Sequence, residues 1–586
     1  MNTLFSNIRN VILMSFLNKF FAKGANPPAL PGEMPLLKVT PLWCFLLFSF
    51  SGGLLFSAAL PPLNFSFAGF FALAPLVWCA HRLEWKRAAI CGWVWGLGWA
   101  LFSFQFLREI EWIVPYLLAP VLAIWPAAAA ALISAGAKGI LYTPAAANEE
   151  YTVKKDYLVK RLPWYRTLIF VLFAALAYTL IEWTRSRLFT WNDLSITQYR
   201  NLPFLQICSV TGSYGVLFLT ALGGAALGCV TLRGGKLCLI PAALLIAANW
   251  GWGEYRMKHL MPVRDKTWSP ALIQGDLSQR RHAGEKEFKE ALETYISMSY
   301  KAAKLKPSLI VWPESAVPIP LRSAHPWGRE FAQEFSTLIS KCRTPMLIGA
   351  LDFVPLPDKK NYGITNSALY FTSEGRLKYK YDKIHRVPYG EYIPLRGLLP
   401  GFLIRMIDMG RDLTPGTNYI PLELPGGPKV STAICYEGVF GYLTREFASR
   451  GAEILLVLSN DAWYPRSSEP EQHLANALMR AIETGLPMVR CGNNGGSGVV
   501  NPDGTLSHFL DVPDQPGRVE IKRGRAMGIV PVKYTFSPER TFYVRNGEWF
   551  ILLLAGLFLL TGGFGYLSFL KACRMLPEST AVLKKR

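Results

Sequence analysis

The sequence predicts a helical membrane domain of about eight spans joined to a large extramembrane α/β domain. Two observations lead to this fold class. Hydrophobic residues make up 51% of the 586 residues and the mean hydropathy is +0.21, which is too apolar for an ordinary soluble protein. The apolar residues gather in separate stretches towards the two ends, whereas residues 256–548 form a polar block that is long enough to bury a core of its own.

The candidate spans follow from length and composition, because a helix needs roughly 20 apolar residues to cross a bilayer. Several stretches are shorter than this, so we expect their ends to shift by a few residues and one of them to be partly re-entrant. The stretches are Trp43–Leu60, Phe65–Ala80, Ala88–Phe106, Tyr116–Ser134, Thr167–Trp183, Val210–Leu232, Leu237–Trp252 and Trp549–Leu570. The predicted division is an N-terminal amphipathic segment and linker (1–40), a membrane domain (41–255), a catalytic domain (256–548), and a last span with a basic cytoplasmic tail (549–586).

The placement of Lys and Arg predicts the orientation in the membrane. The loops 82–87, 138–166 and 233–236 and the C-terminal tail are basic, and they share one side if all the spans form. We therefore expect both termini inside and the block 256–548 outside the cytoplasmic membrane. The segment 185–200 carries three Arg on the predicted outer side, and we interpret it as a partly structured re-entrant segment beneath the polar block.

Charge and cysteine usage limit the partners and cofactors. The formal net charge is +21, and no basic-aromatic nucleic-acid motif accompanies it, so we expect contact with anionic membrane lipids and no nucleic acid. The block holds an odd number of cysteines, Cys342, Cys435 and Cys491, which argues against a disulfide framework but leaves a Cys342–Cys491 bridge open. No Cys/His spacing indicates a metal site, and we expect neither a metal nor a cofactor.

The polar block alternates short β-like runs with helical patterns, which is typical of an α/β domain. Several of the apolar runs end on polar residues. The predicted strands are 271–276, 307–315, 346–350, 367–371, 430–435 and 454–463, and the predicted amphipathic helix is 285–305.

Cys435 is the candidate nucleophile of this block. It ends the apolar run 430–434, and the residues after it indicate a sharp turn into a helix, whose N-terminal N–H groups favour a thiolate. A base must take the thiol proton, and Glu314 at the end of a neighbouring strand could do so. Lys383 could stabilise an oxyanion, with the backbone N–H of Tyr436 as a second donor. Taken singly, a buried structural cysteine, a turn cap and a solvated loop charge remain simpler explanations.

Three motifs together resemble the Glu-Lys-Cys signatures of the nitrilase superfamily. They are Trp312-Pro313-Glu314-Ser315, the run from Lys383 to Glu391, and Ile434-Cys435-Tyr436-Glu437. The Val-Pro-aromatic-Gly-Glu pattern, with 459–463 and Asn493-Asn494-Gly495, resembles the apolipoprotein N-acyltransferase family in particular. The resemblance covers nearly the whole chain.

The resemblance implies a four-layer α-β-β-α sandwich on a base of membrane helices, in a bacterial inner-membrane protein with a periplasmic catalytic domain. It implies ping-pong transfer of an acyl chain from a phospholipid, through a thioester, to the α-amino group of the diacylglyceryl-cysteine of a lipoprotein. Glu314, Lys383 and Cys435 become the catalytic residues, with no metal. Glu391 and Glu437 become supporting residues. The further implied residues are Tyr389, Tyr436 and Trp463 in the substrate site and Leu398, Phe402 and Leu403 in an apolar lid over 395–409, of which a packed surface helix is the alternative.

Two other functions stay open. In a membrane-tethered nitrilase-type amidohydrolase, water would resolve the thioester, although a soluble amide substrate would not need eight spans or an apolar lid. A catalytically inactive scaffold or a transporter is the third possibility. The intact triad argues against the scaffold, and the sparse charges inside the spans argue against the transporter. We expect a monomer.

Overall fold

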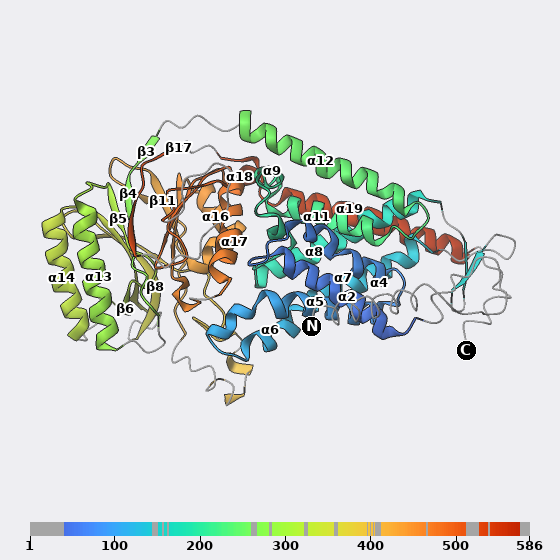
Figure 1. Cartoon of the computed structure of the whole chain (residues 1–586), viewed down its shortest axis with the longest axis horizontal. Helices are drawn as coiled ribbons and strands as arrows, with labels where there is room; N and C mark the ends of the chain where they lie inside the picture. Colours follow the sequence, from blue (N-terminus) through green and yellow to red (C-terminus); the bar gives the residue numbers. More distant parts are fainter. Residues whose placement is uncertain are drawn as a thin grey trace, which may run out of the picture.

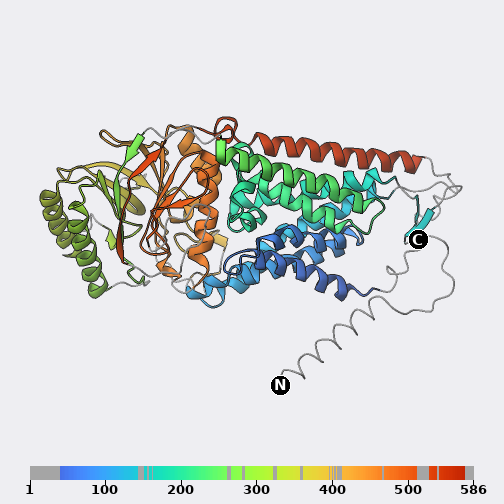
Figure 2. The same cartoon turned by 45° about the horizontal axis from the view of Figure 1, so that its top comes forward.

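The structure is a computed structural model that describes residues 40–142, 151–154, 157–160, 163–259, 266–279, 284–320, 326–356, 361–394, 396–398, 400–401, 404, 412–464, 467–510, 527–536 and 540–574. Apart from its last residue, the predicted amphipathic segment 1–40 lies outside these residues. The molecule is elongated, with long helices at one end and an α/β domain at the other (Figure 1). The last helix, α19 (Trp549–Arg574), runs along the helical region in both views (Figure 2) and packs on α7 (Ile124–Ile140) and α8 (Tyr165–Leu188), so the C-terminal segment returns to the first helical region.

The helical region consists of long apolar helices with short helical pieces between them. The long helices are α2 (Leu42–Ala59), α5 (Trp85–Ser103), α7 (Ile124–Ile140), α8 (Tyr165–Leu188), α11 (Ser213–Gly228), α12 (Gly235–His259) and α19 (Trp549–Arg574). The shorter ones are α3 (Gly69–Ala72), α4 (Ala74–Ala80), α6 (Val114–Leu122), α9 (Leu202–Leu205), α10 (Cys208–Thr211) and α18 (Phe542–Asn546). Two strands, β1 (Tyr151–Lys154) and β2 (Tyr157–Lys160), pair within the loop that precedes α8.

Five helical segments among the described residues are long and apolar enough to cross a membrane. They are Leu42–Ala59, Val114–Ile140, Tyr165–Leu188, Gly235–His259 and Trp549–Lys571. The predicted spans near residues 65–80 and 210–232 correspond to apolar helices of only 10–17 residues, Ser66–Ala80 and Ser213–Gly228. The predicted span 88–106 is the helix α5, which begins with Lys86 and Arg87 in its first turn and is not among the five. A membrane domain of several spans is therefore confirmed, and the count of eight is not.

Small residues let the membrane helices approach closely, as is usual where apolar side chains gain little by leaving lipid. A Cβ atom on Gly53 of α2 would lie 2.1 Å from the Trp95 carbonyl oxygen of α5. A Cβ atom on Gly92 of α5 would lie 2.4 Å from the Pro126 carbonyl oxygen of α7. These two positions explain why α5 packs tightly between α2 and α7.

The α/β domain is built on two sheets. One has the strand order β16-β4-β5-β7-β8-β9, with β6 paired to β7, and the other has the order β10-β11-β12-β13-β14-β15. The strands of the first are β4 (Pro270–Gln274), β5 (Leu309–Val311), β6 (Val317–Pro320), β7 (Met346–Pro355), β8 (Tyr362–Phe371), β9 (Leu377–Asp382) and β16 (Gly528–Pro531). Those of the second are β10 (Leu422–Glu423), β11 (Lys429–Ile434), β12 (Ile454–Ser459), β13 (Met488–Gly492), β14 (Gly498–Val500) and β15 (Leu506–Ser507). A small ribbon of β3 (Lys266–Trp268) and β17 (Tyr534–Phe536) lies beside them.

Helices cover the outer face of each sheet, which gives four layers (Figure 1). The helices α13 (Glu285–Ala303) and α14 (Pro326–Cys342) cover the first sheet at the far end of the molecule, and α16 (Gly441–Ser449) and α17 (Glu469–Thr484) cover the second sheet, facing the membrane helices. The amphipathic pattern of α13 buries Tyr295, whose ring stacks on Trp312 with centroids 5.1 Å apart. The predicted α-β-β-α sandwich is confirmed. Cys342 and Cys491 are both free, so the bridge between them does not form.

Helix α17 joins the catalytic domain to the membrane helices through the side chain of Gln472. Its Oε1 atom accepts hydrogen bonds from Trp191 Nε1 at 3.0 Å and from Asn192 Nδ2 at 2.7 Å. Its Nε2 atom donates to the carbonyl oxygens of Pro61 at 3.2 Å and Ser103 at 3.1 Å. All of these groups are buried, so the two domains share a polar junction as well as an apolar one.

Candidate active site

Parallel strands of both sheets end at the site. In the first sheet β4, β5 and β7 are parallel, and β9 points the same way because it follows two antiparallel pairings. In the second sheet β11, β12 and β13 are parallel. Glu314 follows β5, Lys383 follows β9 and Cys435 follows β11, so three strand ends bring these side chains together. Ligand sites in open α/β sheets commonly form at this edge.

Lys383 lies between two carboxylates. Its Nζ atom is 2.9 Å from Glu391 Oε1 and 3.3 Å from Glu314 Oε1, and its side chain is 2% exposed. Asn366 on β8 donates from Nδ2 to the same two oxygens, at 2.7 Å to Glu314 and 2.9 Å to Glu391. Burial opposes the charge of Lys383, but the neighbouring Glu391 and Glu314 outweigh it and raise the pKa of the ammonium group. Lys383 is therefore a fixed cation.

Cys435 occupies a strained turn between β11 and a short 3₁₀ helix, Cys435–Val439. Its φ of +53° is a left-handed conformation that only a few non-glycine residues adopt. Burial and the nearby Glu314 raise the pKa of the thiol, while Lys383 acts in the opposite direction. The effect of burial on the thiol is therefore opposite to that expected from the helical N–H groups. A buried neutral thiol needs a base to take its proton.

Glu437 forms hydrogen bonds both to the loop after β9, which carries Lys383, and to the end of β11, which precedes Cys435. Its Oε1 atom accepts from the backbone N–H groups of Ile384 at 2.7 Å and His385 at 2.9 Å, and its Oε2 atom accepts from Ile434 N–H at 2.8 Å. The Tyr381 hydroxyl lies 2.9 Å from both oxygens. Burial raises the pKa of Glu437 to about 7, against the opposing effect of these donors and Lys383. One side chain thus fixes the loop after β9 relative to the end of β11.

The residues expected to contact substrate differ in their surroundings. Tyr389 and Trp463 are 50% and 36% exposed. Tyr436 is buried and packs against Phe440 with ring centroids 4.9 Å apart. Of the expected lid, Phe402 and Leu403 lie outside the described residues. Leu398 ends a short helix that begins at Arg396, and its side chain lies outside them.

Aromatic residues of the membrane domain pack against residues close to Cys435, and sequence reasoning missed them. Trp191 packs on Tyr436 with ring centroids 6.0 Å apart and on His473 at 5.6 Å. Phe106 packs on Tyr464 at 5.3 Å, and Phe189 on Tyr436 at 6.3 Å. The segment 185–200 was predicted to lie beneath the polar block. Its aromatic residues, Phe189 and Trp191, could have indicated these contacts.

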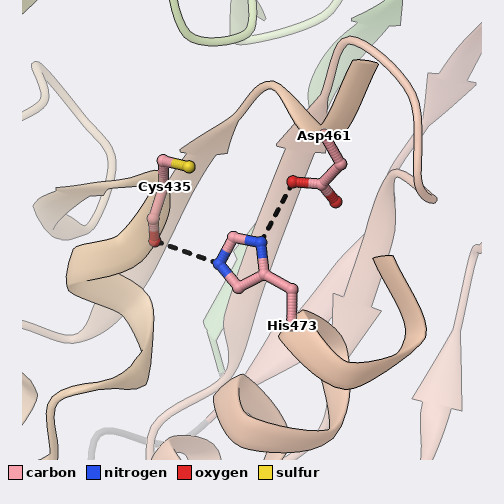
Figure 3. A group of neighbouring side chains, drawn as sticks. All are labelled: Cys435, Asp461 and His473. Carbon is pink, nitrogen blue, oxygen red and sulfur yellow. Dashed lines mark hydrogen bonds and ion pairs between the residues drawn. The ribbon is translucent and has the colours of Figure 1, made fainter. Parts of the chain in front are cut away.

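Asn366 was also missed, because it stands in none of the motifs, and His473 was given no role, although the pair Gln472-His473 fits the same resemblance. His473 belongs to a compact cluster with Cys435 and Asp461 (Figure 3). One ligand atom from each of these three residues lies within 4.8 Å of the others, so the cluster meets the spacing of three metal ligands. The His473 nitrogens already contact Asp461 Oδ1 and the Cys435 carbonyl oxygen, and Arg490 contacts the other Asp461 oxygen. The His473 nitrogens and the Asp461 oxygens, which could bind a metal, are therefore already engaged in contacts within the protein.

A cavity of about 760 Å³ lies away from these residues. It opens between α14 and β8, where Phe331, Arg343 and Phe371 are among the residues that line it. None of the candidate catalytic residues lines this cavity, so it has no part in the chemistry argued below.

Comparison with known proteins gives two family matches along the chain. Residues 52–226 match the apolipoprotein N-acyltransferase N-terminal domain, and residues 271–511 match the carbon-nitrogen hydrolases. An apolipoprotein N-acyltransferase of Geobacter metallireducens is 29% identical over 500 residues, which cover 81% of this chain and 88% of the relative. One from Brucella suis is 27% identical over 550 residues, covering 89% and 96%.

Among solved structures, an amidase from Nesterenkonia sp. is similar with a TM-score of 0.33 and 17% identity, covering 50% of this chain and 98% of the amidase. The two family matches follow one another along the chain, and full-length relatives align across both. The chain is therefore similar to apolipoprotein N-acyltransferases along most of its length, and its α/β domain matches the carbon-nitrogen hydrolases.

Proposed function

We propose that this protein transfers a fatty acyl chain from a phospholipid to the α-amino group of the N-terminal diacylglyceryl-cysteine of lipoproteins, through a thioester on Cys435. The observation that carries the proposal is the buried cluster of Glu314, Lys383 and Cys435 at the convergent strand ends, within a chain similar to this family. Several apolar helices supply the contact with membrane lipid that such substrates require.

The first half-reaction follows from the charges of the site. Glu314 takes the proton of the Cys435 thiol as sulfur attacks the ester carbonyl of the phospholipid. Lys383 and the backbone N–H of Tyr436 stabilise the oxyanion that forms, and a preorganised donor of this kind typically contributes on the order of a hundredfold in rate. The proton then passes from Glu314 to the departing alkoxide of the lysophospholipid, which leaves the acyl group on sulfur.

The second half-reaction uses the same groups in the same order. Glu314 accepts a proton from the incoming amine, the nitrogen attacks the thioester carbonyl, and the oxyanion again faces Lys383. Collapse of this intermediate forms the amide and expels the Cys435 sulfur, which regains a proton. Glu391 and Asn366 keep the side chains of Lys383 and Glu314 in the same positions in both half-reactions.

We also propose the location and the domain division. The basic loops support a bacterial inner-membrane protein with the domain 256–548 on the periplasmic side and residues 41–255 and 549–586 in and beside the membrane. Reporter fusions after Trp252 and after Lys571 test this orientation, with the first expected outside and the second inside. The same side for both would overturn it.

The deciding experiment incubates the purified enzyme with phospholipid and no acceptor. We expect mass spectrometry to show a persistent acyl adduct on Cys435 that disappears on addition of a diacylated lipopeptide. Cys435→Ala and Glu314→Gln should give no adduct, and Lys383→Ala should form it at least roughly a hundredfold more slowly. Steady release of free fatty acid without an acceptor would refute the transferase and favour the amidohydrolase alternative.

A further inference from the structure

The peptide bond between Cys435 and Tyr436 carries two roles at once. Its N–H is the proposed backbone donor to the oxyanion, and its carbonyl oxygen points the opposite way, because a trans peptide is planar and places C=O and N–H antiparallel. Whatever holds the Cys435 carbonyl therefore aims the Tyr436 N–H. The positive φ at Cys435 costs roughly 1–3 kcal/mol, so this turn needs an external restraint to persist.

His473 supplies that restraint. Its Nε2 atom lies 3.1 Å from the Cys435 carbonyl oxygen, and its side chain is 1% exposed. Figure 3 shows the ring facing the carbonyl oxygen, and the contact drawn from Nε2 goes to this oxygen and not to the Cys435 sulfur. The nitrogen that would act as a base towards the sulfur is thus bonded to the carbonyl oxygen instead.

The Cys435 carbonyl oxygen can only accept, so its 3.1 Å contact with Nε2 is a hydrogen bond when Nε2 carries the hydrogen and donates it. In the neutral ring Nδ1 is then an acceptor, and Arg490 Nη2 lies 3.2 Å from it as a donor. Asp461 Oδ1, 3.0 Å from Nδ1, accepts a hydrogen from this nitrogen only in the doubly protonated ring.

The ring is held from two further sides. Arg490 Nη2 is 2.5 Å from the second oxygen of Asp461, so the carboxylate that contacts Nδ1 is itself fixed. Trp191 of the membrane domain also packs on the His473 ring, and its Nε1 donates to Gln472, the residue before His473. The brace on the catalytic peptide thus extends from a buried ion pair to the membrane domain.

We propose that His473 is a positioning residue that aims and polarises the Cys435–Tyr436 peptide, so that the Tyr436 N–H is preorganised for the oxyanion. This inference rests on the proposed function only in taking Cys435 as the acylated nucleophile. A hydrogen bond to the carbonyl also polarises the peptide and strengthens its N–H as a donor. The restraint acts on acyl transfer, which develops an oxyanion, and not on alkylation of the same sulfur, which develops none.

The test compares His473→Asn with His473→Gln in the full-length protein. The Asn amide reaches the position of Nδ1 and keeps polar contact with Asp461 and Arg490, but it does not reach the Cys435 carbonyl. The Gln amide reaches the position of Nε2 and restores the donor. His259→Asn, at the exposed end of α12, is the matched control for the chemical change.

Two rates are measured on Cys435 by mass spectrometry, acylation by an activated ester in single turnover and alkylation by iodoacetamide. We expect His473→Asn to slow acylation on the order of tenfold to a thousandfold, the range for an impaired oxyanion donor, with alkylation changed by less than about threefold. His473→Gln should recover most of the acylation rate. Equal loss of both rates in His473→Asn, or no recovery with His473→Gln, would overturn the proposal in favour of a purely structural role.

The activated ester separates this inference from the proposed function. An enzyme that takes acyl groups from the ester but not from phospholipid would count against the phospholipid donor and leave the role of His473 intact. Unchanged acylation in His473→Asn would overturn the role of His473 whatever the physiological donor is.

Discussion

Replacement of Gly349 by Ala should disable the site although it changes no candidate catalytic side chain. Gly349 lies in β7, beside the segment that leads from β5 to Glu314. A Cβ atom there would be 2.2 Å from the Pro313 carbonyl oxygen and 2.7 Å from Glu314 Cα. Ordinary contacts begin near 3.4 Å, so the backbone that carries Glu314 must move by about 1 Å.

A displacement of this size disturbs the 3.3 Å contact between Glu314 Oε1 and Lys383 Nζ. A misplacement of about 1 Å typically costs on the order of a hundredfold in rate, and we expect that loss in acylation of Cys435 by phospholipid. The assay is the time course of the acyl adduct by mass spectrometry, with thermal unfolding in detergent to show that the variant is folded. Gly251→Ala, where no atom lies within 4 Å of the added Cβ, is the matched control. A folded Gly349→Ala variant with the wild-type acylation rate would refute the proposed dependence on the position of Glu314.

Three more outcomes are expected. Burial and Lys383 lower the pKa of His385 from 6.5 to about 4, so its contribution to stability is present above pH 6.5 and is lost as the pH falls towards 4. Phe carries no titratable ring, so the free energy of unfolding of His385→Phe should fall less than that of the wild type between pH 6.5 and 4, by up to roughly 3 kcal/mol. An equal fall in the two proteins would contradict the lowered pKa of His385. Glu437→Gln replaces one carboxylate oxygen by an NH₂ group that faces a backbone N–H. Chemical denaturation should therefore show a free energy of unfolding lower by about 2 kcal/mol. Gln472→Leu leaves buried partners without their hydrogen bonds, and in the same assay it should lower the free energy of unfolding by roughly 3 kcal/mol.

The local part of the site could be predicted from the sequence, because each motif sits where an apolar strand ends. Glu314 after β5 and Cys435 after β11 follow from hydrophobic runs and turn residues alone. Asn366 could not be predicted, because it lies in the middle of β8 and reaches the carboxylates only through the pairing of β8 with β7 and β9. His473 depends on how α17 packs on the second sheet, which no local pattern encodes.

The membrane domain shows the same division between local and long-range information. Hydropathy located the helices, but it could not decide which of them are long enough to cross, since Ser213–Gly228 is apolar and yet short. It also gave no hint that Trp191 packs against the catalytic domain. Orientation and the lid remain predictions.

The position of α17 has a consequence for the way in which substrates meet the thiol. One face of this helix presents His473 to Cys435, and the adjacent residue, Gln472, is bonded to the membrane helices. One helix therefore links the position of the Cys435 sulfur to that of the membrane helices. If the protein acts as proposed, a lipid-linked acyl group must extend from the membrane to a sulfur held at this position. The reach of the substrate would then select what is acylated.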